Sequence, residues 1–98
     1  MLTLKQLETI CNDLLNELVS ADTDAFRYRM GTYEINFEEA RINGILQEHH
    51  VSLEQLTEDE VDLVYKPVKL FYELSKHFGL STAQEMLKGK KFDLPMYY

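Results

Sequence analysis

The chain has 98 residues, of which 45% are hydrophobic and 28% are charged, and these proportions are typical of one globular domain. No apolar run approaches the roughly 18 residues that a membrane span needs, and the first residues lack the pattern of a secretory signal. A chain of this length buries about 60–70% of its unfolded surface, which suffices for one core but not also for a roomy substrate cleft. We therefore treat residues 1–98 as a single domain.

The net charge of −7 is distributed unevenly along the chain. Residues 1–64 carry 14 acidic and 4 basic side chains, whereas residues 65–98 carry 3 acidic and 6 basic ones. The acidic part would repel nucleic acid and attract basic protein surfaces, and the basic C-terminal third would do the opposite. The single cysteine, Cys11, cannot form an internal disulfide and is expected to be a small buried hydrophobe. This cysteine usage fits a reducing, cytoplasmic compartment.

Residues 3–19 are predicted to form an N-terminal helix. Apolar side chains recur along one broad face at positions 4, 7, 10, 11, 14, 15, 18 and 19, which is helical spacing. Thr3 and Gln6 have the spacing of a capping box. The same stripe also permits a helix–helix seam with a second copy, so a homodimer stays open.

Residues 26–37 are predicted to form a β-hairpin. Phe26–Met30 and Tyr33–Phe37 each alternate apolar and polar side chains, and Gly31–Thr32 between them has the signature of a two-residue type II′ turn. In this register all six apolar side chains share one face. That face must pack on helices, because an isolated hairpin is barely stable.

A long helix is predicted over residues 58–78. It begins at a second capping box, formed by Thr57 and Glu60, and it is apolar around much of its circumference. We expect it to be the central helix of the core, kinked near Pro67.

Shorter elements complete the pattern. Residues 38–49 have helical spacing, residues 52–56 form a connector, and residues 82–88 form a last helix with Ser81 as its N-cap. The predicted fold class is therefore α+β and mostly α, with an N-terminal helix, one hairpin, and three or four further helices. Residues 90–98 form a C-terminal tail that either packs on the core or stays free.

Signatures of catalysis and of metal binding are missing from the sequence. It contains no glycine-rich phosphate loop, no Gly-x-Ser-x-Gly elbow and no His-Glu-x-x-His motif. The acidic groups at 38–39 and 58–62 fall at predicted helix N-termini, where carboxylates are favoured for structural reasons. The adjacent His49 and His50 would point about 100° apart on a regular helix, which does not suit one metal ion. We therefore expect no enzyme, no cofactor and no metal site.

The leading functional expectation is a small acidic protein-binding module, such as an adaptor, a chaperone or an inhibitor. Six tyrosines, five phenylalanines and an apolar tail offer contact area for a partner, and the acids complement a basic partner. In its sharpest form the protein is an inhibitor of the phage anti-defence type, which masks the nucleic-acid-binding surface of its partner. The expected contact residues are Glu38, Glu39, Glu58, Asp59, Glu60, Asp62, Phe92, Tyr97 and Tyr98.

The alternative is a nucleic-acid-binding regulator. Residues 74–88, with the turn Phe-Gly-Leu-Ser at 78–81, resemble a helix-turn-helix. They depart from that family at Glu85, where an apolar residue is expected, and no arginine lies on the second helix. The resemblance implies DNA reading. Apart from it, the basic C-terminal third offers phosphate contacts through Lys76, Lys88, Lys90 and Lys91, and Tyr97 and Tyr98 can stack on unpaired bases.

Overall fold

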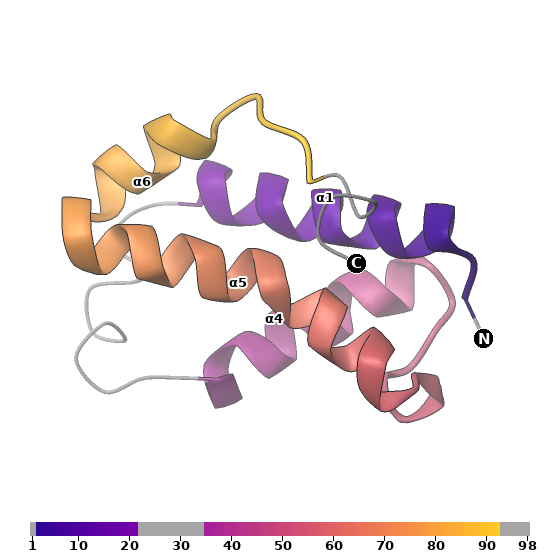
Figure 1. The fold of residues 1–98 in the computed structure, drawn as a ribbon. Helices are drawn as coiled ribbons and strands as arrows, with labels where there is room; N and C mark the ends of the chain where they lie inside the picture. The colour runs from indigo at the N-terminus through magenta and orange to yellow at the C-terminus, as the bar shows by residue number, and fades with distance from the viewer. Residues whose placement is uncertain (1, 22–34, 93–98) are drawn as a thin grey trace.

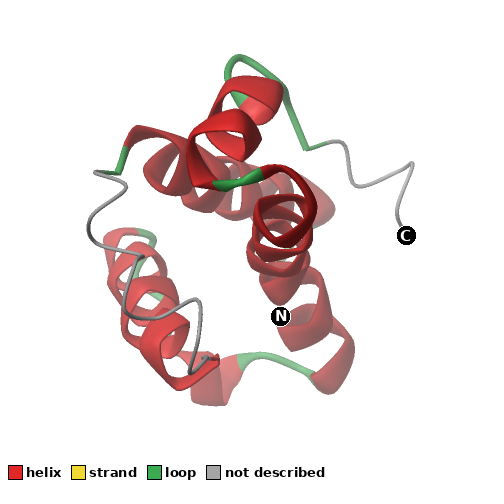
Figure 2. Cartoon of the chain, turned by 90° about the vertical axis from the view of Figure 1, so that its left-hand side faces the viewer, coloured by secondary structure: helices red, strands yellow, loops and turns green. Residues whose placement is uncertain are grey.

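The computed structural model describes residues 2–21 and 35–92 of the chain. The regular elements of these residues are all helical (Figures 1 and 2): α1 (Leu4–Ser20), α4 (Ile35–Glu48), the 3-10 turn η1 (Leu53–Gln55), α5 (Glu58–Phe78) and α6 (Leu80–Leu87). None of the helices described is both long enough and apolar enough to cross a membrane.

The α+β fold class and its β-hairpin are wrong, since the residues that the structure describes form helices and no strand. Ile35–Phe37, which were assigned to the second strand, form the first turn of α4. Residues 26–34, which would carry the first strand, the turn and the start of the second strand, lie outside the described residues. Five alternating residues are too few to distinguish a strand from the beginning of a helix.

Helix α1 is the element on which the other helices assemble. It packs against α4, α5 and α6, and α5 in turn packs against both α1 and α6. Its inward face repeats at intervals of three and four residues and buries Leu7, Ile10, Cys11, Leu14, Leu15 and Leu18. The stripe that would permit a seam with a second copy is therefore used within the monomer.

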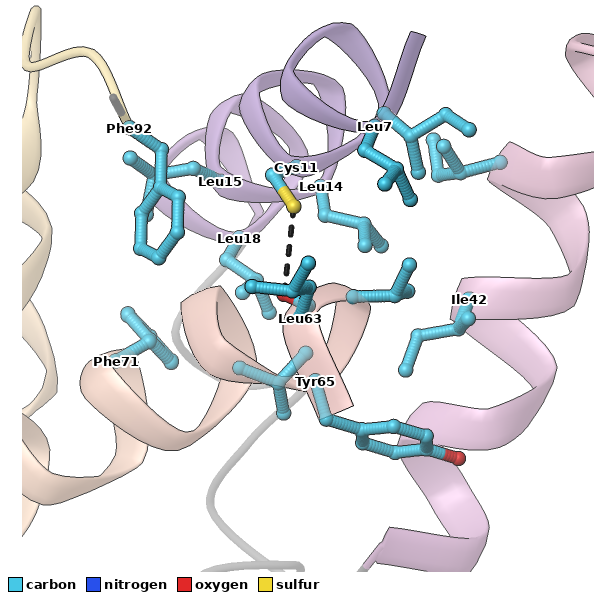
Figure 3. Packing of buried hydrophobic residues seen from close by; sticks show 14 of the residues in the cluster. Leu7, Cys11, Leu14, Leu15, Leu18, Ile42, Leu63, Tyr65, Phe71 and Phe92 are labelled. Carbon is cyan, nitrogen blue, oxygen red and sulfur yellow. Dashed lines mark hydrogen bonds between the residues drawn. The ribbon is translucent and has the colours of Figure 1, made fainter. Parts of the chain in front are cut away.

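The buried side chains form one cluster between the helices (Figure 3). Phe92, which follows α6, also belongs to this cluster and is only 3% exposed. Besides Phe92 and the six α1 side chains, the cluster contains residues of α4, α5 and α6, which are Ile42, Ile45, Leu46, Leu63, Val64, Tyr65, Val68, Phe71, Ala83 and Leu87.

Both predicted capping boxes are confirmed. Thr3 Oγ1 accepts a hydrogen bond from the Gln6 amide at 3.1 Å, and Gln6 Oε1 accepts one from the Thr3 amide at 2.8 Å. Thr57 and Glu60 make the same reciprocal pair at 3.2 and 2.8 Å. These bonds satisfy amide groups that a helix start leaves unpaired, and they place the starts of α1 and α5.

Helix α5 continues through Pro67, and its ribbon changes direction near the middle (Figure 1). Because proline has no N–H, the Leu63 carbonyl four residues earlier lacks its helical donor. The Cys11 thiol of α1 donates to this carbonyl, with 3.4 Å between sulfur and oxygen (Figure 3). Burial raises the pKa of Cys11 to about 12, so the thiol retains the proton that it donates.

Helix α4 ends in a Schellman motif. The Val51 amide bonds the Leu46 carbonyl and the His50 amide bonds the Gln47 carbonyl, each at 3.0 Å. His50 has φ of 60°, a left-handed conformation in which glycine is the usual residue.

Gly79 joins α5 to α6 and has φ of 93°. It ends the first helix and serves as N-cap of the second, so Ser81 lies inside α6 rather than capping it. Gln84 of α6 donates through Nε2 to the carbonyls of Leu18 and Ala21, at 3.1 and 2.7 Å. This side chain thus caps the C-terminal end of α1 and fixes α6 against it.

Candidate functional site

At one end of the molecule α4 finishes, η1 follows and α5 begins (Figure 1), and these segments carry several exposed acidic residues. Residues 48–62 carry six acidic side chains and neither lysine nor arginine, which is a net charge of −6 with histidine neutral. We call this region the acidic end, and its exposed members are Glu48, Glu54, Glu58, Asp59 and Asp62.

Three of the predicted contact residues are therefore brought together on α5. Glu58, Asp59 and Asp62 are exposed and lie within the first turns of the helix, where the helix dipole favours carboxylates. The structure adds Glu48 and Glu54, which the sequence analysis did not single out.

Glu60 is not available to a partner, although the sequence analysis placed it among the contact residues. Its side chain is buried, with 6% exposure. Oε1 accepts the Thr57 amide, and Oε2 accepts the Leu2 amide at 3.1 Å. The hydrogen bond from the Thr57 amide is the largest of the causes that lower the pKa of this carboxyl. Glu60 therefore holds the N-terminal segment against α5.

Glu38 and Glu39 lie in the first half of α4. Glu39 is exposed, and its charge adds to the effect of burial in raising the pKa of Tyr65. Since Tyr65 lies one turn beyond Asp62 on α5, Glu39 borders the acidic end.

The tail residue Phe92 is anchored in the core instead of being presented to a partner. Its backbone N–H donates to Asn12 Oδ1 at 2.6 Å, and its carbonyl accepts from Asn12 Nδ2 at 3.0 Å. One asparagine on α1 thus satisfies both backbone groups of Phe92. Tyr97 and Tyr98, the other aromatic residues predicted to bind a partner, lie outside the described residues.

Of the lysines of the nucleic-acid alternative, Lys76 lies at the opposite end of α5 from its acidic first turns. Lys76 is in the last turn of α5, Lys88 directly follows α6, and Lys90 and Lys91 come next; all four are exposed. The 21 residues of α5 separate its two ends by about 30 Å. Segment 74–88 does fold as two helices joined at Gly79, but the basic charge follows α6 rather than lying on it.

A polar groove separates α1 from the segment 89–91. Its volume is about 440 Å³, and its walls carry Glu8, Asn12, Asp13 and Asn16 on one side and Lys90 and Lys91 on the other. We call it the α1 groove. No local sequence pattern predicts this groove, because its two walls are more than 70 residues apart in the chain.

His49 and Asp13 form a further contact that sequence reasoning missed. His49 Nε2 lies 2.8 Å from Asp13 Oδ2, so the end of α4 is fixed to α1. His50 is exposed and points into no such pair among the described residues. Within residues 2–21 and 35–92, no three His, Cys, Asp or Glu side chains gather closely enough to hold a metal ion.

Comparison with known proteins places no relative beside this chain: no protein-family profile, no curated protein and no solved structure matches it significantly. The candidate sites are therefore the acidic end and the α1 groove, as the geometry alone defines them.

Proposed function

We propose that the protein is a non-enzymatic binding module that uses its acidic end to bind a basic surface on another protein. The observation that carries the proposal is the exposure of Glu58, Asp59 and Asp62 within one stretch of α5, next to Glu54. A field of one sign attracts a complementary surface, and it raises the association rate and the specificity of binding.

The chemistry of the remaining polar groups supports binding over catalysis. Cys11 is buried, and its raised pKa leaves it without the thiolate that a nucleophile needs. Glu60 is used in a helix cap and in holding Leu2. His49 is paired with Asp13 and fixes α4 to α1. Each of these groups serves the fold, whereas the carboxylates of the acidic end face solvent.

An inhibitor that covers the nucleic-acid-binding surface of its partner is one form of this function. Lysine and arginine side chains on such a surface bind phosphates, and exposed carboxylates compete for the same side chains. A free, reduced cysteine is consistent with action in a reducing compartment such as the cytoplasm.

The experiment is affinity capture from lysate, split into nuclease-treated and untreated halves, with the bound proteins identified. The test variant, Glu58→Gln with Asp59→Asn and Asp62→Asn, removes three charges and leaves Thr57 and Glu60 intact. The control, Glu73→Gln with Glu85→Gln, removes two exposed charges elsewhere. We expect one partner protein to be captured even after nuclease treatment. The test variant should fail to capture this partner, and the control variant should still capture it. Equal capture by the test variant would refute the proposal.

Nucleic-acid binding through the basic segment is the second candidate, and the exposure of Lys88, Lys90 and Lys91 after α6 favours it. Recovery that disappears with nuclease, and that Lys88→Gln with Lys90→Gln and Lys91→Gln abolishes, would establish this candidate in place of the first.

A further inference from the structure

The α1 groove carries opposite charges on its two walls, and this feature is independent of the acidic end. Glu8 and Asp13 lie on the helical wall, and Lys90 and Lys91 lie on the wall that residues 89–91 form. In the part of the chain that the structure describes, neither Glu8 nor either lysine takes part in an ion pair. The groove thus holds unpaired charges of both signs on either side of an open space.

Both walls are fixed by contacts elsewhere in the fold. The helical wall is the outer face of α1, whose inner face is the core. The other wall is held at one end by Leu87, which is buried, and at the other by Phe92, which is buried and paired with Asn12. A site with fixed walls loses little conformational entropy when a ligand binds.

The polar groups of the groove divide into those that hold the walls and those that stay open to a ligand. The amide of Asn12 is used by Phe92 and by the Glu8 carbonyl, the latter at 2.9 Å. Asp13 uses Oδ2 for His49, which leaves Oδ1. The charged groups that face a ligand are therefore the Glu8 carboxylate, Asp13 Oδ1 and the two lysine ammonium groups.

We propose that the α1 groove binds an extended peptide segment of a partner protein in which a basic residue is next to an acidic one. Adjacent side chains of an extended chain point to opposite sides, so the basic side chain reaches Glu8 and Asp13 while the acidic one reaches Lys90 and Lys91. The volume of about 440 Å³ lies in the range of small-ligand sites, which is about 300–1,000 Å³, so it accommodates a few residues and not a folded domain.

The test is an NMR titration of the full chain with three blocked dipeptides: acetyl-Lys-Glu-amide, acetyl-Lys-Gln-amide and acetyl-Gln-Glu-amide. We expect the first to shift the backbone amides of Asn12, Asn16 and Gly89, which line the groove. Each dipeptide with a single charge should bind about two- to fivefold more weakly, as exposed ion pairs allow, and the difference should shrink with added salt.

Variants of the protein test which wall of the groove binds which side chain of the dipeptide. Glu8→Gln should reduce the ratio of the affinity for Lys-Glu to that for Gln-Glu. Lys90→Gln with Lys91→Gln should reduce the ratio of the affinity for Lys-Glu to that for Lys-Gln. Glu73→Gln, on the exposed face of α5, is the control and should change neither preference. Equal affinity for the three dipeptides, shifts outside the groove, or free glutamate binding as well as Lys-Glu would overturn the proposal. None of these outcomes bears on the charge variant of the acidic end.

Discussion

The hydrogen bond between Cys11 and the Leu63 carbonyl makes a sharp prediction, because Pro67 is the reason that this carbonyl is free. Cys11→Ala removes the donor and leaves the buried carbonyl unpaired, which costs about 1–3 kcal/mol. The thiol is a weak donor, so we take the lower figure of about 1 kcal/mol. Lost packing of the sulfur, which is fully buried, adds about 1 kcal/mol. The expected loss of unfolding free energy is therefore about 2 kcal/mol.

Pro67→Ala restores an amide N–H at position 67, four residues after Leu63. In that background the carbonyl regains its helical donor, so Cys11→Ala should cost only the packing part, about 1 kcal/mol. The two substitutions should thus couple by about 1 kcal/mol, whereas residues that do not interact add within about 0.3–0.5 kcal/mol.

Urea unfolding followed by far-UV circular dichroism, on the wild type, both single variants and the double variant, measures this coupling. Ile10→Val is the matched control, since Ile10 is buried on the same helix and makes no bond to that carbonyl; its cost should be the same with and without Pro67→Ala. A coupling between Cys11 and Pro67 of less than about 0.3 kcal/mol would mean that the thiol does not replace the missing amide.

Three further predictions test other contacts. His50→Gly should raise the unfolding free energy by about 0.5–1 kcal/mol and the thermal midpoint by several degrees, because glycine accepts the φ of 60° without strain; an unchanged midpoint would contradict this. Glu60→Gln should destabilise the protein most above pH 4.5, the ordinary pKa of the carboxyl. Since the folded-state pKa is lowered, the stabilisation by the Glu60 carboxylate disappears as the pH falls through that pKa. The urea midpoints of the wild type and the variant should therefore differ at neutral pH and converge at acid pH. Asn12→Ala should cost about 1–3 kcal/mol and expose the Phe92 amide to hydrogen exchange; retained protection would refute the anchoring.

Sequence patterns predicted the starts of α1 and α5 well, misplaced the N-cap of α6 and predicted one element wrongly. Thr3 and Thr57 were identified as caps because a capping box involves residues only three apart. The run 33–37 was read as a strand because its apolar positions alternate, yet Ile35 is also seven residues before Ile42, which is two helical turns. Five alternating residues therefore do not exclude a helix, and Ile35–Phe37, the part of this run that the structure describes, are helical.

The candidate sites also contain features that neighbouring residues predict and features that depend on residues far apart in the chain. The exposed cluster of Glu58, Asp59 and Asp62 was visible in the sequence because the three residues are close neighbours on one helix. Glu60, only one position from Asp59, was grouped with them wrongly, since its burial depends on the Leu2 amide, 58 residues away. The α1 groove gave no sequence signal, because it needs residues 89–91 to lie beside α1.

What the sequence determined by itself is what depends on neighbours a few residues apart on one helix: the Thr3 and Thr57 caps and the apolar stripe of α1. The tertiary structure alone decided the pairs Cys11–Leu63, Asp13–His49 and Asn12–Phe92, which span 52, 36 and 80 residues. Each of these pairs joins groups that are polar and common in any sequence. Their partners are fixed only when packing of the helices around α1 excludes water and leaves each group one donor or acceptor within reach.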